Sequence, residues 1–333
     1  MSSSELSPRS AGRRACVLIP IFNDWSAVET LLPLLDTALH NASRQVDVLI
    51  LDDASTVPRG SRLESASFHA IRTVRILELR RNLGHQRALA VGLAYVDAHD
   101  LASTVVVMDG DGEDAPADVP RLLDRYDAEQ GQQVVFAERR RRSESLVFRM
   151  FYWLYRVTHV VMTGRRVRVG NFSVLPGHLL HRLVVVSELW NHYAAAVFKA
   201  RLPFVTVPTA RSNRLDGQSS MSYVSLVVHG LSAISVYNEI IGVRALAAAL
   251  ALMVLAGVGI GVIVWIRVFS DLAIPGWATT GVGVLLVIML QAVLFSMVFS
   301  FITLASRQGL SFLPARDYGY FVDQIVDVYQ RKA

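Results

Sequence analysis

The stretch VVVMDGDGEDAPADVP, residues 105–120, joins a short run of β-branched residues to a dense group of acids. The apolar run stops at Asp109, and four more acids follow it, namely Asp111, Glu113, Asp114 and Asp118. Two interpretations are open at this point. The acids form a solvated turn and the start of a helix, or they bind a divalent cation that holds a phosphorylated ligand.

Alternating strand and helix patterns surround this acidic stretch. Apolar runs predict strands over 15–22, 46–53, 73–81 and 103–111. Helices are expected over 85–100 and over 26–42, the latter with Ser26 as N-cap and Glu29 at the capping-box position. This order predicts an α/β domain with a mostly parallel central sheet. Ligands bind beyond the carboxyl ends of such strands, where the following residues are expected to meet: Asn23, Asp24, Asp52, Asp53, Asp109 and Asp111.

The apolar residues are concentrated after residue 240. They account for 52% of the 333 residues, and the mean hydropathy is +0.37. Two segments, 245–266 and 282–304, carry no charge and are long enough to cross a bilayer. The alternative is a pair of buried core helices, which this length disfavours. The short link between the segments predicts an antiparallel transmembrane hairpin.

Arginines predict how the hairpin is oriented. Arg244 and Arg307 flank its outer ends and Arg316 lies close behind, whereas the link between the helices carries Arg267 alone. Because cytoplasmic loops are richer in Lys and Arg, the large N-terminal domain and the C-terminal tail are expected in the cytoplasm. The high Arg and low Lys content is typical of a high-GC bacterium, so the expected location is a bacterial inner membrane.

Charge and cysteine content narrow the class of protein. The formal charge is +5 and the isoelectric point about 9.5, which suits a partner with phosphate groups. A nucleic-acid partner is not expected, because the acids at the strand ends would repel a phosphate backbone. The single cysteine, Cys16, excludes an intramolecular disulfide.

Five motifs in a fixed order carry a family resemblance: IPIFND (19–24), LDDAS (51–55), RRNLGHQRALAVGL (80–93), MDGDGED (108–114) and RSNRLDGQSS (211–220). Together they resemble family 2 glycosyltransferases, and most of all the polyprenyl-phosphate glycosyltransferases of the dolichyl-phosphate mannose synthase group. The similarity covers about residues 15–222, and the hairpin suits the membrane-anchored members.

The resemblance implies a GT-A-type domain that binds a nucleotide-sugar and a divalent metal, Mg2+ or Mn2+. The implied metal ligands are Asp109, Asp111 and Glu113, of which the last is usually Gln in the family. The implied nucleotide-binding residues are Pro20, Phe22, Asn23, Asp24, Asp52, Asp53 and Asp109. The sequence does not decide which of Asp52 and Asp53 faces the nucleotide.

Arginines and a serine are expected to bind the phosphate of the acceptor. The guanidinium group presents donors in a fixed fork that matches phosphate oxygens. By resemblance the acceptor-phosphate residues are Arg139, Arg142, Arg214 and Ser219, and the catalytic set is Asp111, Arg139 and Arg214. The alternative for the run at 139–142 is a solvated basic surface that faces the membrane. The family usually has Lys after the serine, where this chain has Ser220.

The expected function is inverting transfer of a sugar from a nucleotide-diphosphate-sugar to a polyprenyl phosphate at the cytoplasmic membrane face. Two alternatives remain: a family 2 enzyme with a glycan or another lipid as acceptor, and a non-catalytic membrane-anchored protein that binds nucleotide-sugars. Homo-oligomerisation is left open. The expected domains are a disordered tail (1–14), the transferase domain (15–222), an interfacial amphipathic helix (223–241), the hairpin (242–306) and a cytoplasmic tail (307–333).

Overall fold

The structure is a computed structural model of the whole chain. It describes residues 14–139, 169–210, 212, 214–215, 232, 235–270, 276–308 and 312–331. The chain divides into two units. The sheet-bearing unit comprises Met1–Ser145, Val167–Val236 and Phe312–Ala333, and the second unit comprises Leu146–Arg166 and Tyr237–Ser311.

Four parallel strands form the centre of the sheet: β1 (Ala15–Ile21), β2 (Val46–Asp52), β3 (Ile71–Leu79) and β4 (Thr104–Val107). Their apolar runs are buried on both faces, as parallel strands between helices require. In β1, Cys16 and Leu18 belong to one hydrophobic core, and the alternating Val17 and Ile19 belong to the other. The predicted α/β fold with a mostly parallel sheet is confirmed.

The remaining strands complete an eight-stranded sheet in the order β7-β5-β6-β4-β1-β2-β3-β8. They are β5 (Val134–Arg139), β6 (Ser173–Pro176), β7 (Phe204–Thr209) and β8 (Val322–Gln330). β6 and β8 run antiparallel to the central strands, whereas β5 and β7 run with them.

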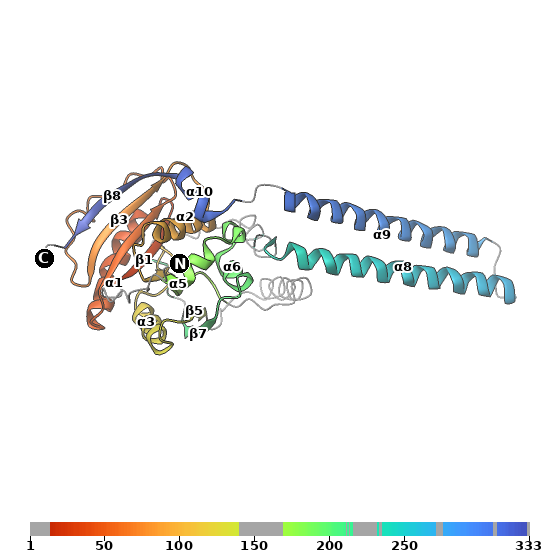
Figure 1. Cartoon of the computed structure of the whole chain (residues 1–333), viewed down its shortest axis with the longest axis horizontal. Coiled ribbons are helices and arrows are strands. Elements are labelled where there is room, and N and C mark those ends of the chain that lie inside the picture. The colour runs from red at the N-terminus through yellow and green to blue at the C-terminus, as the bar shows by residue number, and fades with distance from the viewer. Residues whose placement is uncertain are drawn as a thin grey trace, which may run out of the picture. The chain divides into compact units, whose positions relative to one another are not determined.

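Helices cover both faces of the sheet (Figure 1). α1 (Trp25–Asn41) and α3 (Asp118–Ala128) supply side chains to the core that contains Val17. α2 (His85–Ala98), α5 (Gly177–Leu183), η1 (Ser187–Trp190) and α6 (Tyr193–Lys199) contribute to the opposite core. The loops that follow the central strands lie at the carboxyl edge of the sheet.

The predicted start of the first helix is wrong. α1 begins at Trp25, so Ser26 lies inside its first turn instead of capping it, and Asp24 occupies the cap position without a side-chain capping bond. Trp25 is buried in the core, and this packing sets the start of the helix in place of the capping motif. α3 begins at Asp118, so the last of the five acids lies in its first turn.

The C-terminal segment forms part of the sheet. After the second unit the chain continues through α10 (Pro314–Asp317) and η2 (Tyr318–Tyr320) into β8, which pairs with β3. The sequence predicts only a cytoplasmic tail over 307–333 and misses this strand. Val326 and Val328 pack against the core on one face of β8, which explains why the strand forms.

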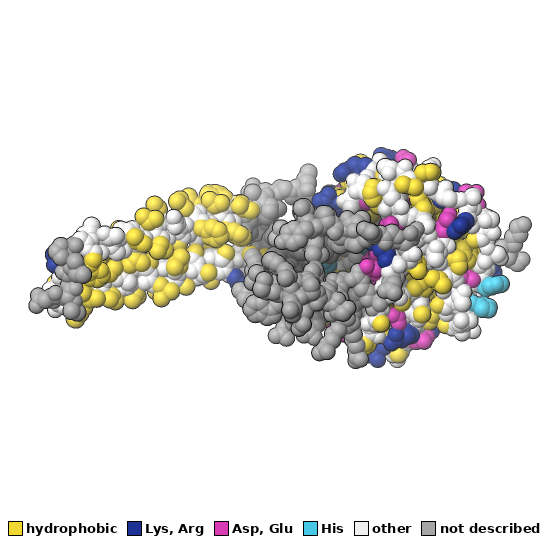
Figure 2. Space-filling model, turned by 180° about the vertical axis from the view of Figure 1, so that it is seen from behind, with side chains coloured by type: hydrophobic (Ala, Val, Ile, Leu, Met, Phe, Trp, Pro, Cys, Tyr) yellow, Lys and Arg dark blue, Asp and Glu magenta, His cyan; other side chains and the backbone are white. Residues whose placement is uncertain are grey.

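The second unit contains two long apolar helices, α8 (Asn238–Phe269) and α9 (Trp277–Gln308). The parts long and apolar enough to cross a membrane are Glu239–Phe269 and Trp277–Ile302, each with a mean hydropathy of 2.6 and few buried residues. Figure 2 shows hydrophobic side chains along these helices. Since soluble core helices are mostly buried, the composition and exposure agree with the predicted membrane association.

Some predicted features lie outside the described residues. They include the disordered tail except its last residue, and most of the interfacial helix expected over 223–241. The arginine run after Arg139 also lies there.

Candidate functional site

Three loops leave the carboxyl edge of the sheet side by side. β1 lies between β2 and β4, with Ile21 opposite Asp52 and Leu18 opposite Val107. The segments that follow these strands therefore start next to one another, as the sequence predicts.

Asn23 organises the loop after β1. It adopts a left-handed backbone conformation (φ 61°), which asparagine tolerates better than most residues. Its Oδ1 accepts hydrogen bonds from the backbone N–H groups of Thr56 (2.7 Å) and Val57 (3.0 Å). Its own N–H donates to the Ser55 hydroxyl at 2.8 Å. The predicted nucleotide-binding residue Asn23 thus fixes the loop after β2, next to the exposed Phe22 ring.

The two carboxylates at the end of β2 have different partners. Asp52 Oδ1 accepts the N–H of Ser55 at 2.9 Å. Asp53 is 2% exposed, and its two oxygens accept the N–H groups of Leu83 (2.7 Å) and Gly84 (2.8 Å). Burial raises the pKa of Asp53, against the lowering effect of these two bonds. Asp53 therefore holds the loop before α2, while its predicted contact with a nucleotide stays a prediction.

The acidic loop after β4 is tightly folded. Asp111 Oδ1 accepts the N–H of Glu113 at 3.0 Å, and Asp114 Oδ2 accepts the N–H of Asp109 at 3.0 Å. Gly110 packs so closely on β1 that a Cβ there would lie 2.8 Å from Ile21 Cγ2. The first interpretation of the acidic stretch thus holds for two of its acids, because Asp114 folds the loop and Asp118 lies in the first turn of α3. Metal binding by the other acids stays a prediction.

A segment distant in the sequence lies across this loop. The N–H of Ser212 donates to the carbonyl of Glu113 (3.1 Å), and that of Leu215 donates to the carbonyl of Asp111 (3.0 Å). Leu215 occupies the space next to Gly112, where φ is +81°. These contacts place Arg214 over the acids.

Arg214 joins two predicted site carboxylates. Its Nη1 lies 3.8 Å from Asp111 Oδ2, and its Nη2 lies 3.6 Å from Asp24 Oδ1. The Arg214 side chain is only 18% exposed, so the two ion pairs are partly shielded from water. The structure therefore brings together Asp24, Asp111 and Arg214, as expected from the sequence.

His85 begins α2 and faces the same loop. Its Nε2 lies 3.3 Å from Asp109 Oδ1 and 2.8 Å from Asn171 Nδ2. Gln86 donates to Asn171 Oδ1 (3.2 Å) and accepts the N–H of Tyr193 (2.8 Å). Loss of hydration lowers the pKa of His85, although the nearby carboxylates raise it. Sequence reasoning missed Asn171, because an isolated Asn far from the acidic motif gives no signal.

The residues present fit a divalent cation in the chemistry of their side chains. Carboxylate oxygens are the ligands that Mg2+ and Mn2+ prefer, and Asp111 already has a cationic partner in Arg214. Within the described ranges, however, no group of three His, Cys, Asp or Glu side chains is placed to hold a metal. The predicted ligands Asp109, Asp111 and Glu113 therefore do not form such a group in this structure.

The remaining predicted acceptor residues are only partly described. The backbone of Arg139 ends β5 opposite Thr209 of β7, but its side chain lies outside the description, as do Arg142 and Ser219. Pro20 is described and belongs to β1, next to the buried Gly110. The roles assigned to these residues stay predictions.

Replacing Asp53 with Asn is expected to destabilise the sheet-bearing unit by about 1–3 kcal/mol, because one of two backbone N–H groups, one buried and one partly buried, loses its acceptor. An amide has one oxygen, whereas Leu83 and Gly84 each donate to a separate oxygen. Thermal unfolding of the full chain measures this effect. Asp52→Asn is the matched control, since its amide can still accept from Ser55. Equal stability of Asp53→Asn and the parent would contradict the assigned role.

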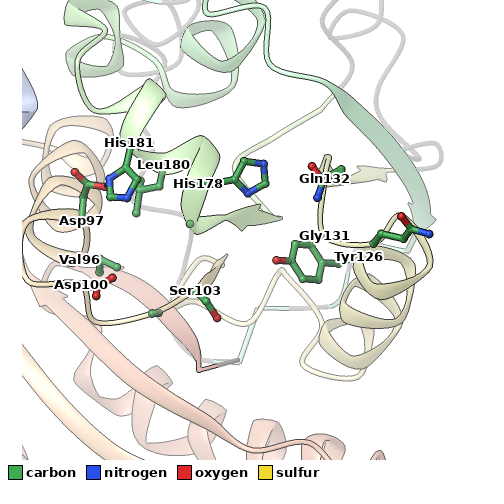
Figure 3. Close-up of a pocket in the computed structure, with 13 residues that line it drawn as sticks. Val96, Asp97, Asp100, Ser103, Tyr126, Gly131, Gln132, His178, Leu180 and His181 are labelled. Carbon is green, nitrogen blue, oxygen red and sulfur yellow. Dashed lines mark ion pairs between the residues drawn. The ribbon is translucent and has the colours of Figure 1, made fainter. Parts of the chain in front are cut away.

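A hollow of about 400 Å3 lies at the opposite edge of the sheet (Figure 3). It is lined by residues that precede β4 and β5, including Ser103 and Gln132, and by His178 and His181. His181 forms an ion pair with Asp97. Because the central strands begin here, this hollow is separate from the site at their carboxyl ends.

Comparisons with known proteins show which family the chain is similar to. Residues 16–179 match the model of the family described as glycosyl transferase family 2. An undecaprenyl-phosphate 4-deoxy-4-formamido-L-arabinose transferase of Klebsiella pneumoniae is 25% identical over 85% of this chain and 83% of its own length. A glycosyltransferase of Bacillus subtilis is 20% identical over 79% of this chain and 80% of its own length.

Two solved structures are also similar. Glucosyl-3-phosphoglycerate synthase from Mycobacterium tuberculosis, solved with Mn2+, UDP-glucose and phosphoglyceric acid, is 16% identical with a TM-score of 0.49, over 69% of this chain and 80% of that one. Mannosyl-3-phosphoglycerate synthase from Rubrobacter xylanophilus is 14% identical with a TM-score of 0.47, over 68% and 72%.

Proposed function

Because this chain is a glycosyltransferase with a family 2 domain over residues 16–179, we propose that it transfers a sugar from a nucleotide-diphosphate-sugar to a polyprenyl phosphate. The single observation that carries the proposal is the acidic loop Asp109–Asp111 with Arg214 lying over it. The undecaprenyl-phosphate transferase relative supports the choice of acceptor.

The donor is assigned to the carboxyl edge of β1, β2 and β4. Asn23 and Asp52 shape the loops that would surround the base and ribose, through their bonds to Ser55, Thr56 and Val57. Asp109 and Asp111 would hold a divalent cation, with Glu113 as the proposed third ligand. When bound, such a cation neutralises the charge that develops on the departing diphosphate.

Arg214 is assigned to the phosphate of the acceptor. A guanidinium group beside Asp111 would bring this anion next to the donor without repulsion between acceptor phosphate and carboxylates. Arg139, Arg142 and Ser219 are proposed as further contacts. The phosphate oxygen is already ionised near neutral pH, so a single displacement with inversion needs no strong general base. Positioning and charge neutralisation then supply most of the rate.

The transferase domain is proposed to face the cytoplasm of a bacterial inner membrane. β8 follows α9 in the chain and pairs with β3 of the same sheet that precedes α8. This connection supports a hairpin whose two outer ends lie on one side of the bilayer. Arg244, Arg307 and Arg316 at or near the outer ends, against Arg267 alone at the link between the helices, support the cytoplasmic side.

The experiment is incubation of the purified full chain in detergent with radiolabelled nucleotide-sugars, Mg2+ or Mn2+, and undecaprenyl phosphate. One donor is expected to deliver its label to the lipid extract, and EDTA is expected to abolish this transfer. Undecaprenol, which lacks the phosphate, is the matched control and should receive no label. Equal labelling of undecaprenol, or transfer to a glycan alone, would contradict the proposed acceptor. Binding of nucleotide-sugars without any transfer would favour a non-catalytic binding protein.

A further inference from the structure

The segment that follows the apolar helices contacts a loop of the candidate site. We define the return segment as residues 312–322 and the site loop as residues 80–84. The N–H of Arg80 donates to the carbonyl of Phe321 at 2.9 Å. The Arg81 guanidinium carbon lies 5.9 Å from the centre of the Phe321 ring. The site loop and the return segment both belong to the sheet-bearing unit, so this contact lies within one unit (Figure 1).

Three aromatic rings pack together next to this contact. Trp190 packs on Phe312 with ring centres 3.8 Å apart and on Phe321 at 5.2 Å. Phe312 and Phe321 meet at 5.6 Å with a steep interplanar angle. Arg87 of α2 lies over the Trp190 ring at 5.4 Å. We call Trp190, Phe312 and Phe321 the aromatic cluster, and its rings have few rotatable bonds, so they hold a surface at low entropic cost.

The aromatic cluster is connected to the buried side of the site loop. Leu79 and Leu83 belong to a small buried core against which Trp190 and Phe321 pack. On the other side, the N–H groups of Leu83 and Gly84 are held by Asp53. The site loop is therefore fixed between the end of β2 and the return segment.

The site loop leads directly to the acidic motif. Gly84 has φ +84° and is followed by His85, whose Nε2 lies 3.3 Å from Asp109 Oδ1. A shift of the loop would move His85 relative to Asp109, because no residue separates Gly84 from the first residue of α2. Small displacements at a reacting centre cost much of the rate.

We propose that Phe321 is a positioning residue for glycosyl transfer, acting through the site loop on His85 and Asp109. Among the described residues, the ring of Phe321 contacts Trp190, Phe312 and Arg81, none of which is a predicted site residue. Its effect on the site is therefore argued through the loop. The proposal relies on the proposed function only for the identity of the reaction. The bracing of the loop is independent of it and has its own measurement.

The test uses the full chain in detergent, with Phe321→Ala, Phe321→Tyr and the control Tyr329→Ala. Tyr329 lies farther along β8 and packs edge-to-face on Phe68 at 5.0 Å, away from the site loop. Hydrogen exchange at residues 80–84 is expected to become about tenfold faster in Phe321→Ala, matching the loss of an aromatic contact. Transfer is expected to lose about tenfold in kcat with the KM for the acceptor unchanged. Phe321→Tyr keeps the ring and should restore both.

Three results would overturn the proposal. The first is unchanged hydrogen exchange at residues 80–84 in Phe321→Ala, and the second is the same acceleration of exchange there in Tyr329→Ala. The third is a loss of transfer in Phe321→Ala that is fully explained by a smaller amount of folded protein. If the parent chain transfers no sugar from any donor, the proposed function fails. The exchange comparison still decides in that case whether Phe321 braces the loop.

Discussion

Asp111→Asn is expected to lower the transfer rate by about 100- to 1000-fold, the usual effect of removing one electrostatic group aimed at developing charge. The amide oxygen of Asn can still accept the N–H of Glu113, so the turn over residues 111–113 should persist. What is lost is the negative charge that attracts a divalent cation and that lies 3.8 Å from Arg214. The variant should therefore remain folded and membrane-associated while it loses activity.

The measurement is the transfer rate over a range of Mg2+ or Mn2+ concentrations, with thermal unfolding alongside. Asp124→Asn is the matched control, because Asp124 is a well-exposed carboxylate that pairs with Arg44 at 2.9 Å on the surface. It removes the same charge and should leave transfer unchanged. Full activity of Asp111→Asn, or full activity of the parent in EDTA, would end the metal assignment.

The central strands could be predicted because their pattern is local. Runs such as Ala15–Ile21 and Val46–Asp52 are short, apolar and rich in β-branched residues, and their spacing admits a helix between them. The start of α1 could not be predicted from capping residues, because burial of Trp25 outweighs the weaker preference for Ser26. A capping preference is worth about 1 kcal/mol, and the burial of a large apolar side chain can outweigh it.

β8 escaped prediction because its partner is remote. Asp327 pairs with Arg75, and the two apolar helices lie between them in the sequence. The strand reads VDQIVDVYQ, with half its residues polar, since it lies at the edge of the sheet with one face exposed. Nothing local distinguishes such a strand from a polar tail.

The candidate site could be predicted in part. The order of strands places Asp24 and Asp111 at one edge, and Arg214 is found with them. Sequence could not assign Asp53, since the carboxylate that ends a strand looks the same whether it meets a ligand or a loop. The bonds to Leu83 and Gly84 show the loop contact. Asn171 was missed for the same reason, because its hydrogen bonds to Gln86 and His85 depend on the folded sheet.

Arg214→Ala is expected to lower kcat/KM for the polyprenyl phosphate by about 10- to 150-fold. The lost contact is a charge-assisted hydrogen bond to phosphate, worth about 1.5–3 kcal/mol. Arg214→Lys should recover only part of this, because an ammonium group lacks the fork of donors. Donor affinity should change much less, since the proposed donor residues lie in the loops at Asn23, Asp52 and Asp109.

The measurement is a pair of saturation curves, one for acceptor and one for donor, for each variant. Arg125→Ala is the matched control, because Arg125 is an exposed arginine of α3 that forms an ion pair with Glu129 at the end of the helix. Arg214→Ala also removes the ion pairs with Asp24 and Asp111, so these carboxylates lose that cation and their negative charge can affect donor binding. A fall in donor affinity with normal acceptor kinetics would mean that the unneutralised carboxylates repel the donor. Arg214 would then be assigned to the diphosphate of the donor. A loss confined to the acceptor assigns Arg214 to the lipid phosphate, because only that ligand brings a second anion beside the acidic loop.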